Sequence, residues 1–136
     1  SRKTINLIWD EYVNNMLAIS SNKKKMGEVT NKISEILMMG RSLGIRLIIV
    51  CQRPDVEGGF PRGSRLNFGI IIILGAVFVS VYSMVMPKEL MARVGERSFY
   101  YGEGVMLWQG TDLYFIKVPI IRDEEKMKAI CIEALN

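Results

Sequence analysis

The stretch Thr4-Ile5-Asn6-Leu7-Ile8-Trp9-Asp10-Glu11-Tyr12 is a mostly apolar run that ends in two adjacent carboxylates. Strands that are buried on both faces of a parallel sheet have such apolar sequences. In open α/β sheets, ligands bind at the carboxyl ends of the strands, which is where Asp10 and Glu11 would lie. The alternative is that the two acids serve the N-terminus of a following helix. The stretch therefore predicts a buried strand with two acids at its ligand-binding edge.

A second apolar run, residues 47–51, ends in Gln52-Arg53-Pro54. Between the two runs, residues 27–43 carry apolar side chains at helical spacing, and Gly44 closes the segment. The predicted apolar face consists of Val29, Ile33, Ile36, Leu37 and Leu43. A strand, a helix and a second strand in this order predict a βαβ unit with polar residues at both strand tips.

Four motifs occur in order along the chain: IWDEYVNNM at 8–16, GRSLGIRLIIVCQRP at 40–54, GEGVMLWQG at 102–110 and IIRDEEKMKAI at 120–130. Together they resemble the motor domain of the FtsK/SpoIIIE family of DNA translocases, with the first motif in the place of the Walker B strand. The chain departs from the family pattern at Cys51, usually Thr, at Val105, usually Asp, and over residues 75–86. These departures indicate a divergent branch, such as the FtsK-like proteins of Gram-positive conjugative elements.

The resemblance implies an α/β fold, specifically a partial RecA-like P-loop NTPase fold. Its sheet would be mostly parallel and flanked by helices, with a C-terminal β-hairpin and helix. Residues 1–136 would form the C-terminal part of the motor domain, from the Walker B strand onward. No Gly-x-x-x-x-Gly-Lys-Ser/Thr phosphate loop occurs in the sequence. We therefore expect that the chain alone neither binds ATP tightly nor hydrolyses it.

The parent protein implied by the resemblance is a hexameric, ATP-driven translocase of double-stranded DNA that uses ATP and Mg²⁺ in DNA transfer, segregation or conjugation. It would be cytoplasmic and anchored to the cytoplasmic membrane by a part outside this chain. The alternative is a non-enzymatic module, derived from such a motor, that binds DNA or a protein partner.

The resemblance assigns roles to three residues at the strand tips. Asp10 would hold the Mg²⁺ shell, and Glu11 would polarise the water that attacks the γ-phosphate. Gln52 would sense the phosphate, because an amide can donate to a phosphate oxygen and accept from water. The alternative for Gln52 is a hydrogen bond to a nearby loop.

Four arginines are further candidates. Arg53, Arg62 and Arg65 lie on one predicted loop that also contains Gly58, Gly59 and Pro61, and the resemblance places this loop against the DNA backbone. A solvated basic loop is the alternative, and Arg65 could instead reach a neighbouring subunit's nucleotide. Arg41 either acts across a subunit interface or complements the dipole of its own helix. The cationic connection Lys23-Lys24-Lys25 is expected to be a solvated loop, with contact to DNA as the alternative.

Composition limits the chemistry. The chain has 136 residues, a net charge of +4 and no histidine, so one domain is expected, without a histidine-based relay or a usual zinc site. Cys51 and Cys131 are expected to be reduced core thiols of a cytosolic protein.

Residues 66–86 contain no charged side chain. This uncharged segment is as long as a membrane-spanning helix needs to be. The alternative, which we favour, is a short central strand at Ile70-Ile71-Ile72-Ile73, buried on both faces, followed by a helix that ends at Pro87. The apolar positions of that helix are Val77, Val81, Met84 and Val85.

In the C-terminal third, the sequence predicts a helix over residues 87–94, with Pro87 at its first position. Two strands, 104–109 and 113–118, follow and are joined by a turn at 110–112. A final helix is expected to be capped by Asp123 and to bury Met127, Ile130, Cys131 and Leu135.

Overall fold

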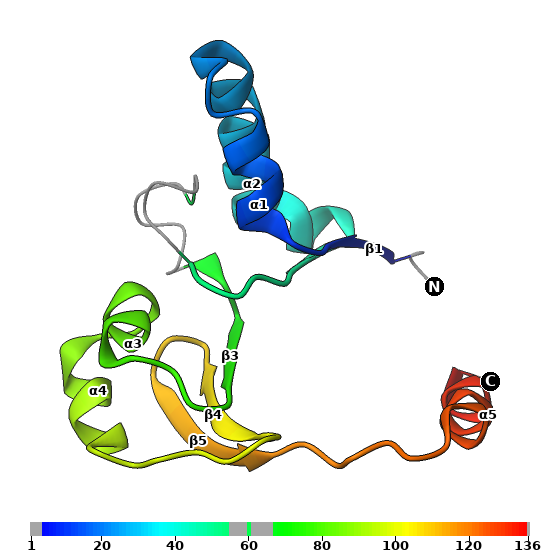
Figure 1. Ribbon diagram of the computed structural model, residues 1–136. Helices are drawn as coiled ribbons and strands as arrows, with labels where there is room; N and C mark the ends of the chain where they lie inside the picture. The colour runs from blue at the N-terminus through cyan, green and yellow to red at the C-terminus, as the bar shows by residue number, and fades with distance from the viewer. Residues whose placement is uncertain (1–3, 55–59, 61–66, 136) are drawn as a thin grey trace.

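The computed structural model describes residues 4–54, 60 and 67–135. Figure 1 shows two groups of elements and a separate C-terminal helix. In chain order the elements are β1 (Ile5–Trp9), α1 (Tyr12–Ala18), α2 (Lys23–Leu43), β2 (Ile45–Ile49), β3 (Ile70–Leu74), α3 (Val79–Val85), α4 (Lys88–Val94), β4 (Glu103–Trp108), β5 (Asp112–Lys117) and α5 (Glu124–Leu135).

The first group is the predicted βαβ unit, with a short additional helix. Strands β1 and β2 pair in parallel, in a register that runs from Ile5 opposite Ile45 to Trp9 opposite Ile49. Helix α2 begins earlier than predicted, because the Asn22 side chain caps it by accepting a 3.0 Å hydrogen bond from the backbone N–H of Lys25. The three lysines 23–25 therefore form the first helical turn and not a loop.

The predicted end of α2 is confirmed. Gly44 adopts a left-handed conformation with φ 74°, which glycine reaches without steric cost. Of the predicted apolar face, Ile33 is buried and Val29, Ile36 and Leu37 are partly buried. Leu43 is 64% exposed, so its predicted burial is wrong; it is the last residue of α2, where the chain turns at Gly44 into β2.

The core of this group forms around α1. Tyr12 and Met16 are fully buried against Ile33 of α2, and the Trp9 ring meets the Tyr12 ring edge-on at 5.1 Å between centroids. The core therefore lies on the α2 side of the sheet and fixes the segment that follows β1.

The predicted burial of β1 on both faces is wrong for the described residues. Ile5 is 61% exposed and Ile8 is 66% exposed. Among the described strands, β1 pairs only with β2, and α2 contacts one face of the pair. An apolar sequence thus formed a strand as predicted, without the second layer that would bury it.

The second group is an antiparallel sheet in the order β3-β4-β5. Figure 1 shows α3 and α4 beside one face of this sheet. They share a core with it that contains Ile73, Tyr82, Met86, Val105 and Leu107. The α/β class is confirmed. A mostly parallel sheet is wrong for the described residues, because only β1 and β2 are parallel.

The four isoleucines at 70–73 form a strand, as predicted, but not one that is buried on both faces. Ile73 faces the core, whereas Ile70 is 47% exposed and Ile72 is 53% exposed. Strand β3 pairs with β4 along one edge, and the helices cover one sheet face. The helix predicted after this strand is present as α3. Among the described residues, no helix is both long and apolar enough to cross a bilayer.

The hairpin and final helix are confirmed, with strands one residue earlier than predicted. The Asp123 carboxylate accepts a 2.9 Å hydrogen bond from the backbone N–H of Lys126, as expected of a cap. The predicted burial of the α5 face is wrong: Met127, Ile130 and Cys131 are exposed, because α5 stands apart at the end of an extended segment (Figure 1). The side chain of Leu135 lies outside the described part of the chain.

Candidate functional site

The parallel pairing of β1 and β2 brings the two predicted strand tips together. Backbone hydrogen bonds continue the ladder past both strands. The N–H of Val50 donates to the carbonyl of Trp9 at 3.0 Å, and the N–H of Tyr12 donates to the carbonyl of Val50 at 3.1 Å. Asp10 and Glu11 therefore leave β1 beside the point where Cys51 and Gln52 leave β2. The candidate site consists of these strand tips.

The backbone of Glu11 is unusual. Its φ of 51° and ψ of 38° lie in the left-handed region, which costs a residue with a side chain on the order of 1 kcal/mol. Such conformations cluster at functional sites. The preceding Asp10 stabilises this turn, because its Oδ1 accepts a 2.9 Å hydrogen bond from the backbone N–H of Glu11.

Two asparagines that the sequence analysis did not single out hold the acidic pair. The Asn14 amide donates to Glu11 through a 2.7 Å Nδ2···Oε2 hydrogen bond. The Asn15 amide donates to the backbone carbonyl of Asp10 at 3.0 Å. Asn14 is three residues after Glu11, and this spacing puts two side chains on one face of a helix. The spacing is the feature of the sequence that could have identified Asn14 as a partner of Glu11.

The residues behind the acids are partly shielded from water. Burial first, and the nearby Cys51 second, raise the pKa of the Tyr12 hydroxyl to about 12. Burial first, and the negative charge of Glu11 second, raise the pKa of the Cys51 thiol. The charge of Glu11 acts on Cys51 because the tips of β1 and β2 lie close together. Cys51 is half-buried, but Cys131 is exposed, so the prediction of a core thiol is wrong for Cys131.

The other predicted site residues are less closely grouped. Gln52 and Arg53 are exposed just beyond β2, and Arg41 is exposed in the last turn of α2. Arg62 and Arg65 lie outside the described residues. Among the residues that the structure describes, the backbone pairing of β1 and β2 places Asp10 and Glu11 at the same sheet edge as the segment that leads through Cys51 to Gln52 and Arg53.

The acids fit a magnesium ion that is shared with phosphates. Mg²⁺ is usually held by one or two carboxylates together with waters and substrate phosphates, and not by an all-protein cage. Asp10 and Glu11 are exposed, and one Asp10 oxygen is not used by the turn hydrogen bond. In the part of the chain that the structure describes, no group of three metal-binding side chains forms. The described part of the site thus offers carboxylates of the right kind for this ion.

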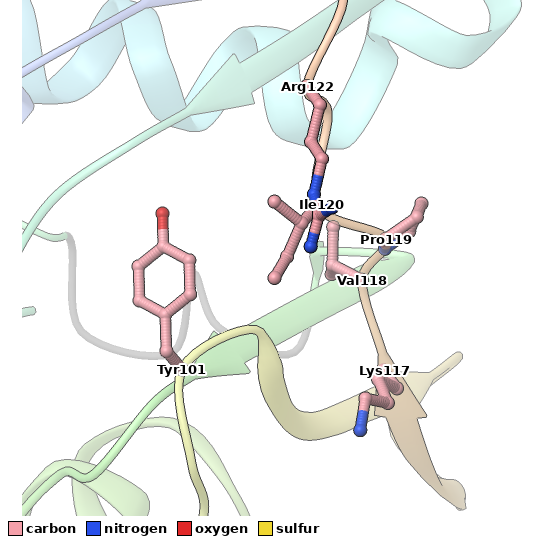
Figure 2. Close-up of a pocket in the computed structure, with 6 residues that line it drawn as sticks. All are labelled: Tyr101, Lys117, Val118, Pro119, Ile120 and Arg122. Carbon is pink, nitrogen blue, oxygen red and sulfur yellow. The ribbon is translucent and has the colours of Figure 1, made fainter.

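Two hollows lie elsewhere on the surface. One, of about 500 Å³, lies where the segment after β5 passes the turn before β4. Figure 2 shows Tyr101 on one side of it, opposite Ile120 and Arg122. The other, of about 660 Å³, runs between α2 and the strands β1 and β2. Neither is lined by a predicted site residue, so the strand tips remain the candidate site.

Comparison of the chain with protein-family models, with curated proteins and with solved structures finds no match. The functional reading therefore depends on the residues of the site and on their geometry.

Proposed function

We propose that this chain is the C-terminal part of a RecA-like motor domain of the FtsK/SpoIIIE type, which moves double-stranded DNA at the expense of ATP. The observation that carries the proposal is that parallel strands β1 and β2 end at one sheet edge, where β1 leads into Asp10 and Glu11 and β2 leads into Cys51 and Gln52. Adjacent parallel strands that end in an acid pair and a polar amide match what a nucleotide-hydrolysing site requires.

In this proposal Asp10 holds Mg²⁺ together with the phosphates of ATP, and Glu11 orients the attacking water. The magnesium ion, when bound, neutralises charge that develops on the phosphate oxygens. Gln52 lies at the tip of the neighbouring strand, where its amide can hydrogen-bond a phosphate oxygen. The left-handed Glu11 supports a functional reading, because a strained backbone persists where the surroundings enforce it.

The Glu11 carboxylate also argues against the simpler role of capping α1. Glu11 is the N-cap residue of this helix, yet its side chain makes no capping hydrogen bond to the backbone. An N-cap side chain ordinarily accepts from the backbone N–H groups of the first turn. The carboxylate instead accepts a hydrogen bond from the Asn14 side chain.

Arg53 follows Gln52 directly and is exposed, which suits contact with a DNA phosphate close to the nucleotide site. Arg62 and Arg65 are proposed to extend this contact, and Arg41 is proposed to reach a neighbouring subunit in a ring. No phosphate loop is present in the sequence, so activity is proposed only for the assembled motor.

The test is ATP-dependent movement along DNA. The chain is joined to the phosphate-loop segment that the proposal requires, and displacement of a triplex-forming strand from double-stranded DNA is measured. We expect displacement that requires ATP and that falls when Arg53 is changed to Ala. Lys126→Ala, on the distant α5, is the matched control for loss of a cation. DNA binding without ATP-dependent displacement would instead establish the non-enzymatic binding module.

A further inference from the structure

We propose that Asn14 is a positioning residue, which fixes the Glu11 carboxylate so that its second oxygen is presented to the attacking water. This inference rests on the proposed ATPase function and extends it to a residue outside the motif match. Its geometric basis is the 2.7 Å hydrogen bond from Asn14 Nδ2 to Glu11 Oε2.

The contact is specific because of where the two residues lie. Glu11 is the N-cap of α1 and Asn14 is the third residue of the helix. In a capping box, the side chain at this third position accepts from the backbone N–H of the N-cap residue. Here the Asn14 amide donates to the N-cap side chain, so the hydrogen bond orients a carboxylate and does not cap the helix.

The chemistry of the pair suits a water-orienting carboxylate. An ionised carboxylate has two oxygens and about four acceptor positions, so one hydrogen bond to Oε2 leaves Oε1 able to accept from water. A lysine or arginine in this place would neutralise the carboxylate. The uncharged Asn14 amide fixes the carboxylate and leaves its negative charge in place. Asn15 holds the backbone of Asp10 through its own hydrogen bond, so side chains from the first turn of α1 restrain both acids.

The first test uses the chain alone. Side-chain amide signals of Asn14 are followed by NMR in ¹⁵N-labelled protein as the pH is lowered until carboxylates protonate. We expect these signals to move, and expect Glu11→Gln to abolish that movement. Asn6, exposed on β1 opposite Arg46, is the control whose signals should move much less. Asn14 signals that move no more than those of Asn6 in the unchanged protein would overturn the proposal.

The second test uses the assembled motor and measures steady-state ATP hydrolysis. Because a small misplacement of a catalytic group costs up to about 10²-fold in rate, Asn14→Ala should lower kcat at least about tenfold. KM for ATP should stay within about twofold, since binding in the ground state is not affected. Asn14→Gln keeps the donor and should recover part of the rate, whereas Asn31→Ala should have no effect.

The double variant Glu11→Gln/Asn14→Ala separates the possible results. If Asn14 acts through Glu11, the double variant is no slower than Glu11→Gln alone. If Glu11→Gln abolishes turnover but Asn14→Ala and Asn14→Gln leave kcat unchanged, the positioning role is wrong and the proposed function stands. If Glu11→Gln leaves turnover unchanged, both are wrong.

Discussion

Trp9 and Ile49 pair in the parallel ladder of β1 and β2, and each is the last residue of its strand. Because the strands run in the same direction, the residues that follow leave the sheet at the same edge. Asp10 and Glu11 therefore lie beside Val50 and Cys51, and Gln52 is the next residue, although the two segments are separated in sequence by α1 and the 21-residue α2. This relationship produces the candidate site.

The first prediction concerns thiol reactivity. The thiolate is the reactive form, so the raised pKa and partial burial of Cys51 should make it react with a disulfide reagent more slowly than the exposed Cys131. Glu11→Gln removes a nearby negative charge and should therefore speed the reaction of Cys51. Rates are measured in Cys51→Ser and Cys131→Ser variants, so that each thiol is seen alone. An unchanged Cys51 rate in Glu11→Gln would mean that the strand tips are further apart than described.

The second prediction concerns the left-handed backbone of Glu11. Glycine adopts this conformation freely, so the free energy of unfolding of Glu11→Gly should exceed that of Glu11→Ala, which also lacks the hydrogen bond to Asn14, by about 1 kcal/mol. At Glu28, an exposed position within α2, the order should be reversed, with Glu28→Gly less stable than Glu28→Ala by about 1 kcal/mol. Urea denaturation measures both. A Glu11→Gly protein that is no more stable than Glu11→Ala would show that the residue is not strained.

The third prediction compares two glycines of α2. A Cβ on Gly40 would lie 2.9 Å from the carbonyl oxygen of Ile45, so Gly40→Ala should lower the free energy of unfolding by about 1–3 kcal/mol. Gly27 has open space at the same atom, and Gly27→Ala should raise stability by up to about 1 kcal/mol through helix propensity. Equal effects in thermal denaturation would contradict the close packing of α2 on β2.

The fourth prediction is a pH dependence. The Lys117 ammonium, at 3.1 Å, and then the backbone N–H of Tyr100 hydrogen-bond the Glu103 carboxylate and lower its pKa below the ordinary 4.5. A lowered folded-state pKa means that this stabilisation is present above pH 4.5 and is lost as the pH falls through the lowered value. Lys117→Ala should raise the pKa of Glu103 in an NMR titration. Lys128→Ala, on α5, should not change it.

The sequence predicted the elements better than it predicted their burial. Apolar runs, the Gly44 stop and the Asp123 cap are local signals, and each marked a helix or strand that is present. Burial depends on which other segments cover an element, and periodicity does not contain that information. For this reason β1, β3 and α5 were predicted to be more buried than they are.

The candidate site was likewise predicted only in part. The acids and Gln52 were found because they end apolar strands, and the parallel order of these strands brought them together. Asn14 was missed because an asparagine in a helix is usually a solvated polar residue. Only the side-chain geometry identifies Glu11 as its hydrogen-bond acceptor.

The most direct test of the central claim is the ATP hydrolysis rate of the assembled motor with and without Glu11→Gln, measured together with ATP binding in the presence of double-stranded DNA. If Glu11 orients the attacking water, the substitution should lower kcat by about 10²–10⁴-fold while ATP still binds. The control variant Glu28→Gln, which removes an exposed carboxylate on α2, should retain the full rate. DNA-stimulated hydrolysis that survives Glu11→Gln at the unchanged rate would contradict the assignment of the strand tips as a catalytic site.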